Sequence, residues 1–179
     1  FDFSAFTGLT SLNLSRATIT AEQFNAIPQA SKASIKALYL IGVDCTDFDF
    51  SDFTGLTSLN LFGATITDEQ FNAIPQASKA SIKDLNLTRV DCTDFDLSAF
   101  TGLTTLNLLD ATITAEQFNG IPQDSKASIK ALNLRGVDCI GFDFSDFTGL
   151  TTLILWDAKI TSEQFNAIPQ ASKASIKAL

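Results

Sequence analysis

One leucine pattern returns at a fixed interval along the whole chain. The run LTSLNL begins at residue 9, and the pattern L-x-x-L-x-L begins again at residues 56, 103 and 150, a period of 47 residues. A sister pattern, I-x-x-L-x-L, begins at residue 35 and returns with the same period. A fixed period of this size is typical of a solenoid, in which each unit packs mainly on its neighbours. We therefore expect a stack of similar coils.

The 47-residue unit repeats without insertion or deletion. Phe1, Phe48, Phe95 and Phe142 begin the four copies, and the last copy stops at Leu179 after 38 residues. Because a single coil cannot bury its own leucines, stacking has to supply the missing neighbour. We predict one domain over residues 1–179, made of about eight coils and forming part of a longer array.

Each unit divides into a long coil, such as residues 9–34, and a short coil, such as residues 35–55. Both begin with alternating apolar residues that predict a strand with one buried face. Thr20 with Gln23 three residues later predicts a capped helix, and Pro28 predicts its end and the start of a second short helix. The eight expected strands begin near residues 9, 35, 56, 82, 103, 129, 150 and 176.

The short coil has no room for the same helix. Its residues 47–53 read DFDFSDF, so phenylalanine alternates with polar residues. That alternation predicts that Phe48, Phe50 and Phe53 face the core while the polar atoms stay in water or cap a turn.

The repeat resembles the leucine-rich repeat family, whose pattern is L-x-x-L-x-L-x-x-N-x-L. The matching residues are Leu9, Leu12, Leu14 and Ile19 in the long coil and Ile35, Leu38, Leu40 and Cys45 in the short coil. The long coil is similar to the ribonuclease-inhibitor branch and the short coil to shorter types. The resemblance implies an α/β solenoid with a curved parallel β-sheet on the concave side and short helices and turns on the convex side.

The chain departs from that family at one position. Ala17 in the long coil and Val43 in the short coil stand where the family usually has an asparagine that satisfies backbone groups in the turn. Thr18 or Asp44, one residue later, is a candidate replacement, and the sequence leaves both open.

Charge and composition exclude several classes of function. The chain has 20 acidic and 12 basic residues and a pI near 4.3, which argues against nucleic acid as a partner because such binding needs clustered basic residues. Histidine is absent, so the commonest general base and metal ligand are missing. No apolar run approaches the roughly 18 residues of a membrane span. We expect no membrane insertion.

The cysteines occupy one position of the unit. Cys45, Cys92 and Cys139 lie 47 residues apart, which places them about 10 Å apart if two coils separate successive copies. A disulfide needs Cα atoms within about 7 Å. We expect three separate buried thiols, which are compatible with a reducing compartment, although a secreted or cell-surface location also stays open.

Variation among the four copies is concentrated on one predicted face. Of the 47 offsets 16 vary, and these include eight of the ten that a leucine-rich repeat would place on the concave face. Helical positions that we expect to be exposed do not vary, among them Asn25, Ser31 and Lys32. We therefore expect a diversified binding face. Its candidate residues are Ser15, Arg16, Tyr39, Ile41, Phe62, Thr88, Arg89, Leu109, Asp110, Arg135, Trp156 and Asp157.

The function predicted from the sequence is non-enzymatic binding of a protein or peptide on that face. Phe62, Leu109 and Trp156 would be apolar anchors, since aromatic residues dominate many interfaces. No catalytic motif, cofactor motif or metal motif is present, and the Asp-rich residues 47–52 lack the central Gly and distal Glu of a calcium loop. Two alternatives stay open: a structural segment that self-associates end to end, and an engineered consensus scaffold.

Overall fold

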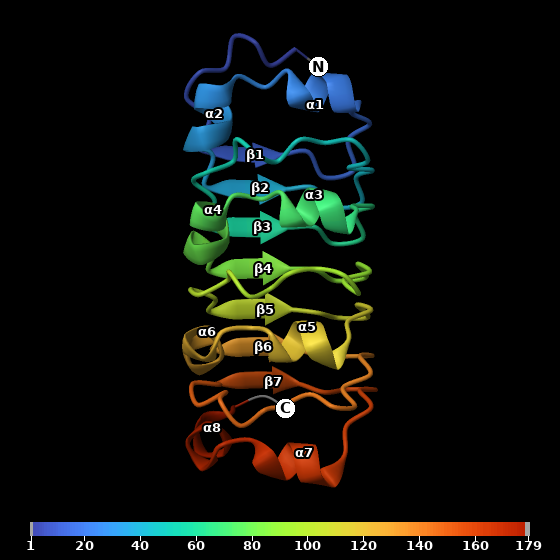
Figure 1. The fold of residues 1–179 in the computed structure, drawn as a ribbon, viewed down its shortest axis with the longest axis vertical. Helices are drawn as coiled ribbons and strands as arrows, with labels where there is room; N and C mark the ends of the chain where they lie inside the picture. The colour runs from blue at the N-terminus through green and yellow to red at the C-terminus, as the bar shows by residue number, and fades with distance from the viewer. Residues whose placement is uncertain (1, 178–179) are drawn as a thin grey trace.

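The computed structural model describes residues 2–177 and is an α/β fold with a solenoid-like course. Seven short strands form one parallel sheet, and each strand pairs with the next one in the chain (Figure 1). The register aligns Leu12 with Leu38 and Leu38 with Leu59, so the repeated leucines form one row. The strands are β1 (Ser11–Asn13), β2 (Ala37–Tyr39), β3 (Ser58–Asn60), β4 (Asp84–Asn86), β5 (Thr105–Asn107), β6 (Ala131–Asn133) and β7 (Thr152–Ile154).

The eighth expected strand falls at the end of the described residues. The Lys177 amide donates to the Thr151 carbonyl at 2.9 Å. The equivalent Lys130 makes the same bond to the Thr104 carbonyl one unit earlier. Ala178 and Leu179, which would complete that strand, lie outside the described residues.

Each long coil carries two helices, and the predicted capping box is confirmed at three of the four. Thr20 Oγ1 accepts from the Gln23 amide at 3.3 Å, and Gln23 Oε1 accepts from the Thr20 amide at 3.1 Å. Thr114 is the exception, because its hydroxyl donates to the Gln117 side chain instead. The helices are α1 (Ala21–Asn25), α2 (Gln29–Ser34), α3 (Asp68–Asn72), α4 (Gln76–Ser81), α5 (Ala115–Asn119), α6 (Gln123–Ser128), α7 (Ser162–Ala167) and α8 (Gln170–Ser175).

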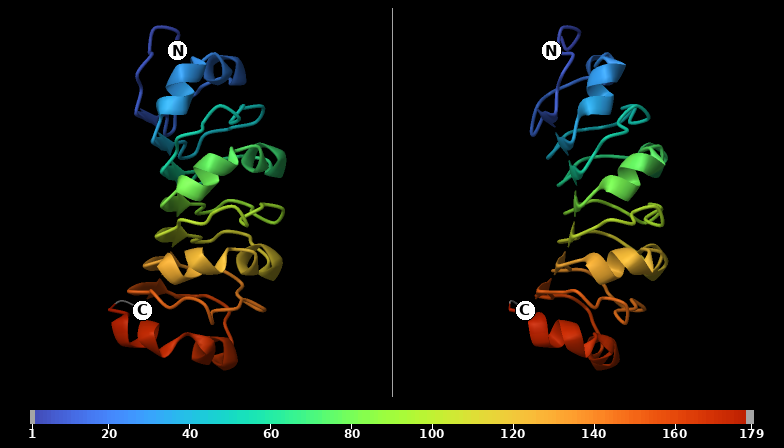
Figure 2. Two further views of the ribbon diagram at one scale, coloured as in Figure 1. Left: turned by 60° about the vertical axis from the view of Figure 1, so that its left-hand side comes forward. Right: turned by 90° about the vertical axis from the view of Figure 1, so that its left-hand side faces the viewer.

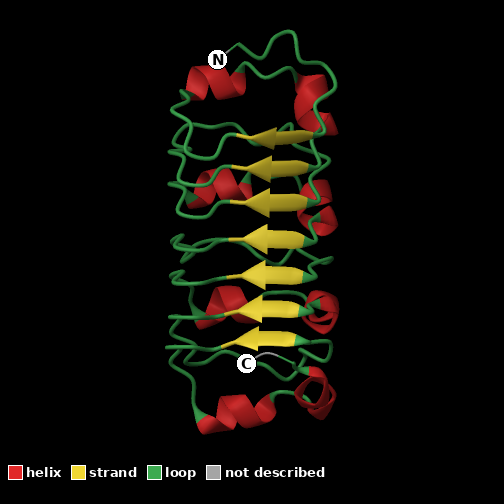
Figure 3. Ribbon diagram, turned by 180° about the vertical axis from the view of Figure 1, so that it is seen from behind, coloured by secondary structure: helices red, strands yellow, loops and turns green. Residues whose placement is uncertain are grey.

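The strands and the helices lie on opposite sides of the molecule. Figure 2 shows the strands along one side of a gently bent column, on its inner side, with the helices and loops on the outer side. Figure 3 shows that none of the eight helices in the described part of the chain covers the other face of the sheet. Within residues 2–177, no helix has the length and apolar character needed to cross a membrane.

Stacked phenylalanines fill the space between the sheet and the helices. Phe24 of α1 stacks on Phe48 with ring centroids 4.1 Å apart and lies 5.4 Å from Phe53. Phe48, Phe50 and Phe53 are each at most 3% exposed, which confirms that all three face the core. The short coil thus contributes its phenylalanines to the core of the long coil beside it.

Two side chains of the second long coil tie it to the loops on either side. Ser78 donates from Oγ to the Phe53 carbonyl and accepts from the Leu56 amide at 3.0 Å, both in the preceding loop. Asn72 donates to the Asp94 carbonyl at 3.1 Å and accepts from the Asp96 amide at 2.8 Å, both in the following loop. Equivalent asparagine bonds occur at Asn25 and Asn119. These contacts form an asparagine ladder on the helical side of the fold.

The expectation that the invariant helical residues are exposed is wrong for Ser31 and Lys32, which are 0% and 3% exposed. The ammonium group of Lys32 donates to the Asn25 carbonyl at 3.1 Å. In the next unit, burial lowers the pKa of the equivalent Lys79, while the nearby Asp96 acts to raise it. These positions stay constant because packing and hydrogen bonds require them, so their constancy does not by itself show that the sheet face was selected to vary.

Backbone hydrogen bonds hold the turns where the expected asparagine is missing. The Ala17 amide donates to the Leu14 carbonyl at 2.9 Å and closes a four-residue turn whose third residue, Arg16, has φ 59°. This matches a type II turn. The Arg16 amide then donates to the Ile41 carbonyl of the next coil at 2.7 Å. In the short coil, Asp44 Oδ1 accepts from the Thr46 amide at 3.0 Å.

The three cysteines are free and buried, as predicted. Burial, with a smaller contribution from Asp44, raises the pKa of Cys45 to about 12. The same causes raise the pKa of Cys139 to about 12 and raise that of Cys92 as well. These thiols are packing residues.

Candidate functional site

The candidate site is the uncovered side of the sheet together with the turn that follows each strand, which we call the sheet face. In each strand the central residue is buried and its two neighbours point away from the core. The seven strands place the first and last turns about 29 Å apart at roughly 4.8 Å per strand. This length suits a peptide or a loop of a partner better than a large domain.

Eleven of the twelve candidate residues lie in the turns, and Tyr39 lies in β2. The turn row, which is the second residue after each strand, consists of Ser15, Ile41, Phe62, Thr88, Leu109, Arg135 and Trp156. The left-handed row, which is the next residue along, consists of Arg16, Gly42, Gly63, Arg89, Asp110, Gly136 and Asp157. The structure therefore brings the candidates together as two adjacent rows along one edge of the sheet face.

Trp156 is the most prominent apolar side chain in the turn row. Its exposed fraction is 64%, the largest among the exposed large hydrophobic residues of the described chain. The Arg135 guanidinium lies 3.6 Å from the centroid of its ring. A cation–π contact of this kind holds both side chains in place and reduces the entropy that a partner's binding would cost.

A second cluster surrounds Phe62. The Arg89 guanidinium lies 5.7 Å from the Phe62 ring, and Arg89 Nε lies 3.5 Å from a carboxylate oxygen of Asp110. Both charged side chains are largely exposed, so this ion pair adds little to stability. It does orient the arginine over the aromatic ring.

Thr88 does not belong to the exposed surface. It is 2% exposed, and its Oγ1 has no hydrogen-bond partner in the described part of the chain. Its contribution to the site stays a prediction, and the structure places its side chain below the surface. The turn row is therefore interrupted between Phe62 and Leu109, which are both partly exposed.

The left-handed row has positive φ in every copy, which the sequence-based choice of candidates did not take into account. The φ values of the non-glycine members are 59° for Arg16, 56° for Arg89, 52° for Asp110 and 58° for Asp157. L-residues adopt this region at a cost of roughly 1–2 kcal/mol relative to the right-handed one. Glycine occupies three of the seven positions, and this could have indicated the positive φ from the sequence alone. Charged side chains persist here although glycine would relieve the strain.

A shallow hollow of about 210 Å³ in the sheet face also escaped the prediction. Tyr39 lies at one end, and Asp84 is the charged residue that lines it. Asparagines from consecutive strands contribute to its wall. The signal in the sequence was an asparagine two residues before five of the seven turns. The asparagine row consists of Asn60, Asn86, Asn107 and Asn133, of which the first three line the hollow.

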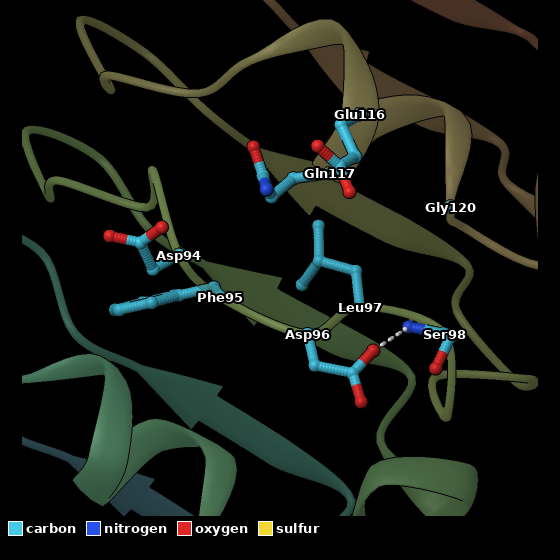
Figure 4. Close-up of a pocket in the computed structure, with 8 residues that line it drawn as sticks. All are labelled: Asp94, Phe95, Asp96, Leu97, Ser98, Glu116, Gln117 and Gly120. Carbon is cyan, nitrogen blue, oxygen red and sulfur yellow. Dashed lines mark hydrogen bonds between the residues drawn. The ribbon is translucent and has the colours of Figure 1, made fainter.

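A larger hollow, of about 370 Å³, lies on the helical side between α5 and the loop before β5. Figure 4 shows Asp94 and Asp96 from the loop and Glu116 and Gln117 from α5 around it. A hollow of similar volume occurs one unit earlier, so this shape is a property of the repeat. The carboxylate of Asp96 accepts from the Ser98 amide at 2.8 Å, and bonds to Ser98 lower its pKa. Among the described residues, no three His, Cys, Asp or Glu side chains are placed so that together they could hold a metal ion.

The comparisons with known proteins found no match. No protein-family model, no curated protein and no solved structure is significantly similar to the chain.

Proposed function

We propose that this chain is a leucine-rich repeat module that binds a protein or peptide on its sheet face, without catalysis. The observation that supports this most strongly is the exposed Trp156, held by Arg135 in a row that also includes Phe62 and Leu109. Aromatic and arginine side chains dominate the binding energy of many interfaces, and exposed apolar patches usually mark interaction sites. The uncovered sheet gives such a partner a continuous surface.

A displayed library of random peptides, selected on the immobilised chain, tests this proposal. Replacing Phe62, Leu109 and Trp156 together by Ala should weaken the selected peptides at least about tenfold, because hot-spot truncations typically cost about 2 kcal/mol or more. The matched control replaces Glu22, Glu69 and Glu163 by Ala. These residues are exposed on the helical side, so their replacement should change the affinity by less than about twofold.

Circular dichroism and thermal melting of both triple variants establish that they fold. The proposal fails if selection yields no binding peptide. It also fails if the selected peptides bind the Phe62, Leu109 and Trp156 variant as tightly as the parent chain.

A further inference from the structure

We propose that the asparagine row binds the carbonyl groups of a polyproline II segment that lies along the solenoid axis. This proposal deepens the proposed function, because it rests on peptide binding at the sheet face and names the conformation of the peptide. The free donors of the row, their spacing and the aromatic side chain at one end all favour this ligand.

Each asparagine in the row uses only its oxygen within the protein. Asn60 Oδ1 accepts from the Phe62 amide at 3.0 Å, and Asn107 Oδ1 accepts from the Leu109 amide at 3.1 Å. Asn86 and Asn133 make the same bond to Thr88 and Arg135. Among residues 2–177, none of the four Nδ2 groups donates a hydrogen bond. Asn60, Asn86 and Asn107, which line the hollow, therefore keep their side-chain N–H donors free for a ligand.

The ligand that matches this row offers acceptors and no donors. A polyproline II helix has no internal hydrogen bonds, so its carbonyl groups are free. Proline has no backbone N–H, so a proline run has only acceptors along its backbone. An α-helix does not match, because its carbonyls are already bonded within the helix.

The spacing of the donors selects the same conformation. Every second strand of the sheet, such as β3 and β5, is separated by about 9.6 Å. Carbonyls on one side of a polyproline II helix repeat every three residues, or about 9.3 Å. An extended strand repeats every two residues, or about 6.6 Å, which fits neither one strand spacing nor two. Asn60 and Asn107 can thus contact successive turns of the same peptide.

Aromatic side chains lie beside the asparagine row. Tyr39 lines the end of the hollow at β2, and Phe62 follows Asn60 by two residues. Aromatic side chains are what proline-rich segments pack against in known recognition grooves. An oligosaccharide is the competing occupant. Its hydroxyl groups also donate, and because the asparagine oxygens already accept from the turn amides, Asp84 is the charged acceptor that lines the hollow.

Calorimetric titration of an uncharged, end-blocked decaproline peptide into the chain tests this inference. The key variant is Asn60→Asp with Asn107→Asp, which keeps an oxygen for each turn amide and removes the donors. It should raise Kd at least about tenfold, as expected for two lost hydrogen bonds. Asn13→Asp is the matched control, because Asn13 Oδ1 accepts from the Ser15 amide outside the hollow. Its Kd should stay within about twofold of the parent value.

The outcomes separate this inference from the proposed function. Decaproline binding that the double variant loses and the control keeps supports the inference. If decaproline binds no better than a Gly/Ser peptide of equal length, or if the double variant binds it normally, the inference is wrong. Library peptides that still bind through Trp156 would then leave the proposed function standing. If a linear glucose hexamer binds and decaproline does not, the polyproline II inference is also wrong.

Discussion

Single residues decide the shape of the turn that carries the candidate site. The turn after each strand needs a left-handed third residue, and the chain fills that position with glycine in some copies and a charged residue in others. The sequence shows the variation, but the positive φ follows only from how the turn closes on the next coil. Charged residues are retained here at a cost in stability, which is the pattern of a position kept for its side chain.

The cost of that backbone conformation can be measured with two substitutions. Arg16→Gly should raise the free energy of unfolding by up to about 1 kcal/mol, because glycine adopts this φ without strain. Gly63→Ala should lower it by about 1–2 kcal/mol, although an added Cβ would meet no atom within 4 Å. Urea unfolding provides both values. Equal stability of Gly63→Ala and the parent chain would contradict the turn geometry.

The thiol of each cysteine should be unreactive in the folded chain. Burial raises the pKa of Cys45 to about 12, so almost no thiolate exists at pH 8 and the reactive form appears only well above that pH. A colorimetric thiol reagent at pH 8 should detect no thiol in the native protein and three in guanidinium chloride. Rapid labelling of the native protein would show that the cysteines are not packing residues.

At the scale of the elements, the repeat predicted what lies within one coil better than what joins two coils. The capping box at Thr20 and the burial of Phe48 follow from spacings of a few residues, and both are confirmed. The bonds of Asn25 and Ser31 reach loops 22 to 25 residues away, so local periodicity could not reveal them. The same limit applies to the asparagine row, because its hollow exists only once the strands are side by side.

The asparagine ladder on the helical side gives a matched pair of variants. Asn119→Ala removes a donor to the Gly141 carbonyl and an acceptor for the Asp143 amide, and it should cost about 1–3 kcal/mol. Asn166→Ala makes the same change in the last unit, where no following coil is described, and should cost less than about 0.5 kcal/mol. The two thermal melts measure the difference. Equal losses would show that the ladder does not stabilise the fold.

At the scale of the whole molecule, each coil pairs only with its immediate neighbours. The contacts between strands all join consecutive strands in the chain. Stability of such an array is close to a sum over coils and the interfaces between neighbours. A substitution in one coil should therefore have little effect on distant coils. The four copies vary mostly on the sheet face, and a few helical positions, such as those of Ala21, Ala26 and Ala30, vary as well.

Position along the array should therefore set the cost of a core truncation. Leu106 is fully buried between two neighbouring strands, so Leu106→Ala should cost about 3–5 kcal/mol. Leu12 lies in the first strand with one paired neighbour and is 8% exposed, so Leu12→Ala should cost about 2–3 kcal/mol. Chemical denaturation compares them. A larger loss at Leu12 would contradict an array of nearest-neighbour contacts.

Trp156 lies on the sheet face, so its signal tests directly whether a partner binds there. The chain has one tryptophan, so its indole N–H gives a single nuclear magnetic resonance signal that needs no further assignment. Titration with a peptide selected on the chain should shift or broaden that signal in proportion to the fraction bound. A peptide that binds at saturation and leaves the indole signal unchanged would place the binding surface elsewhere.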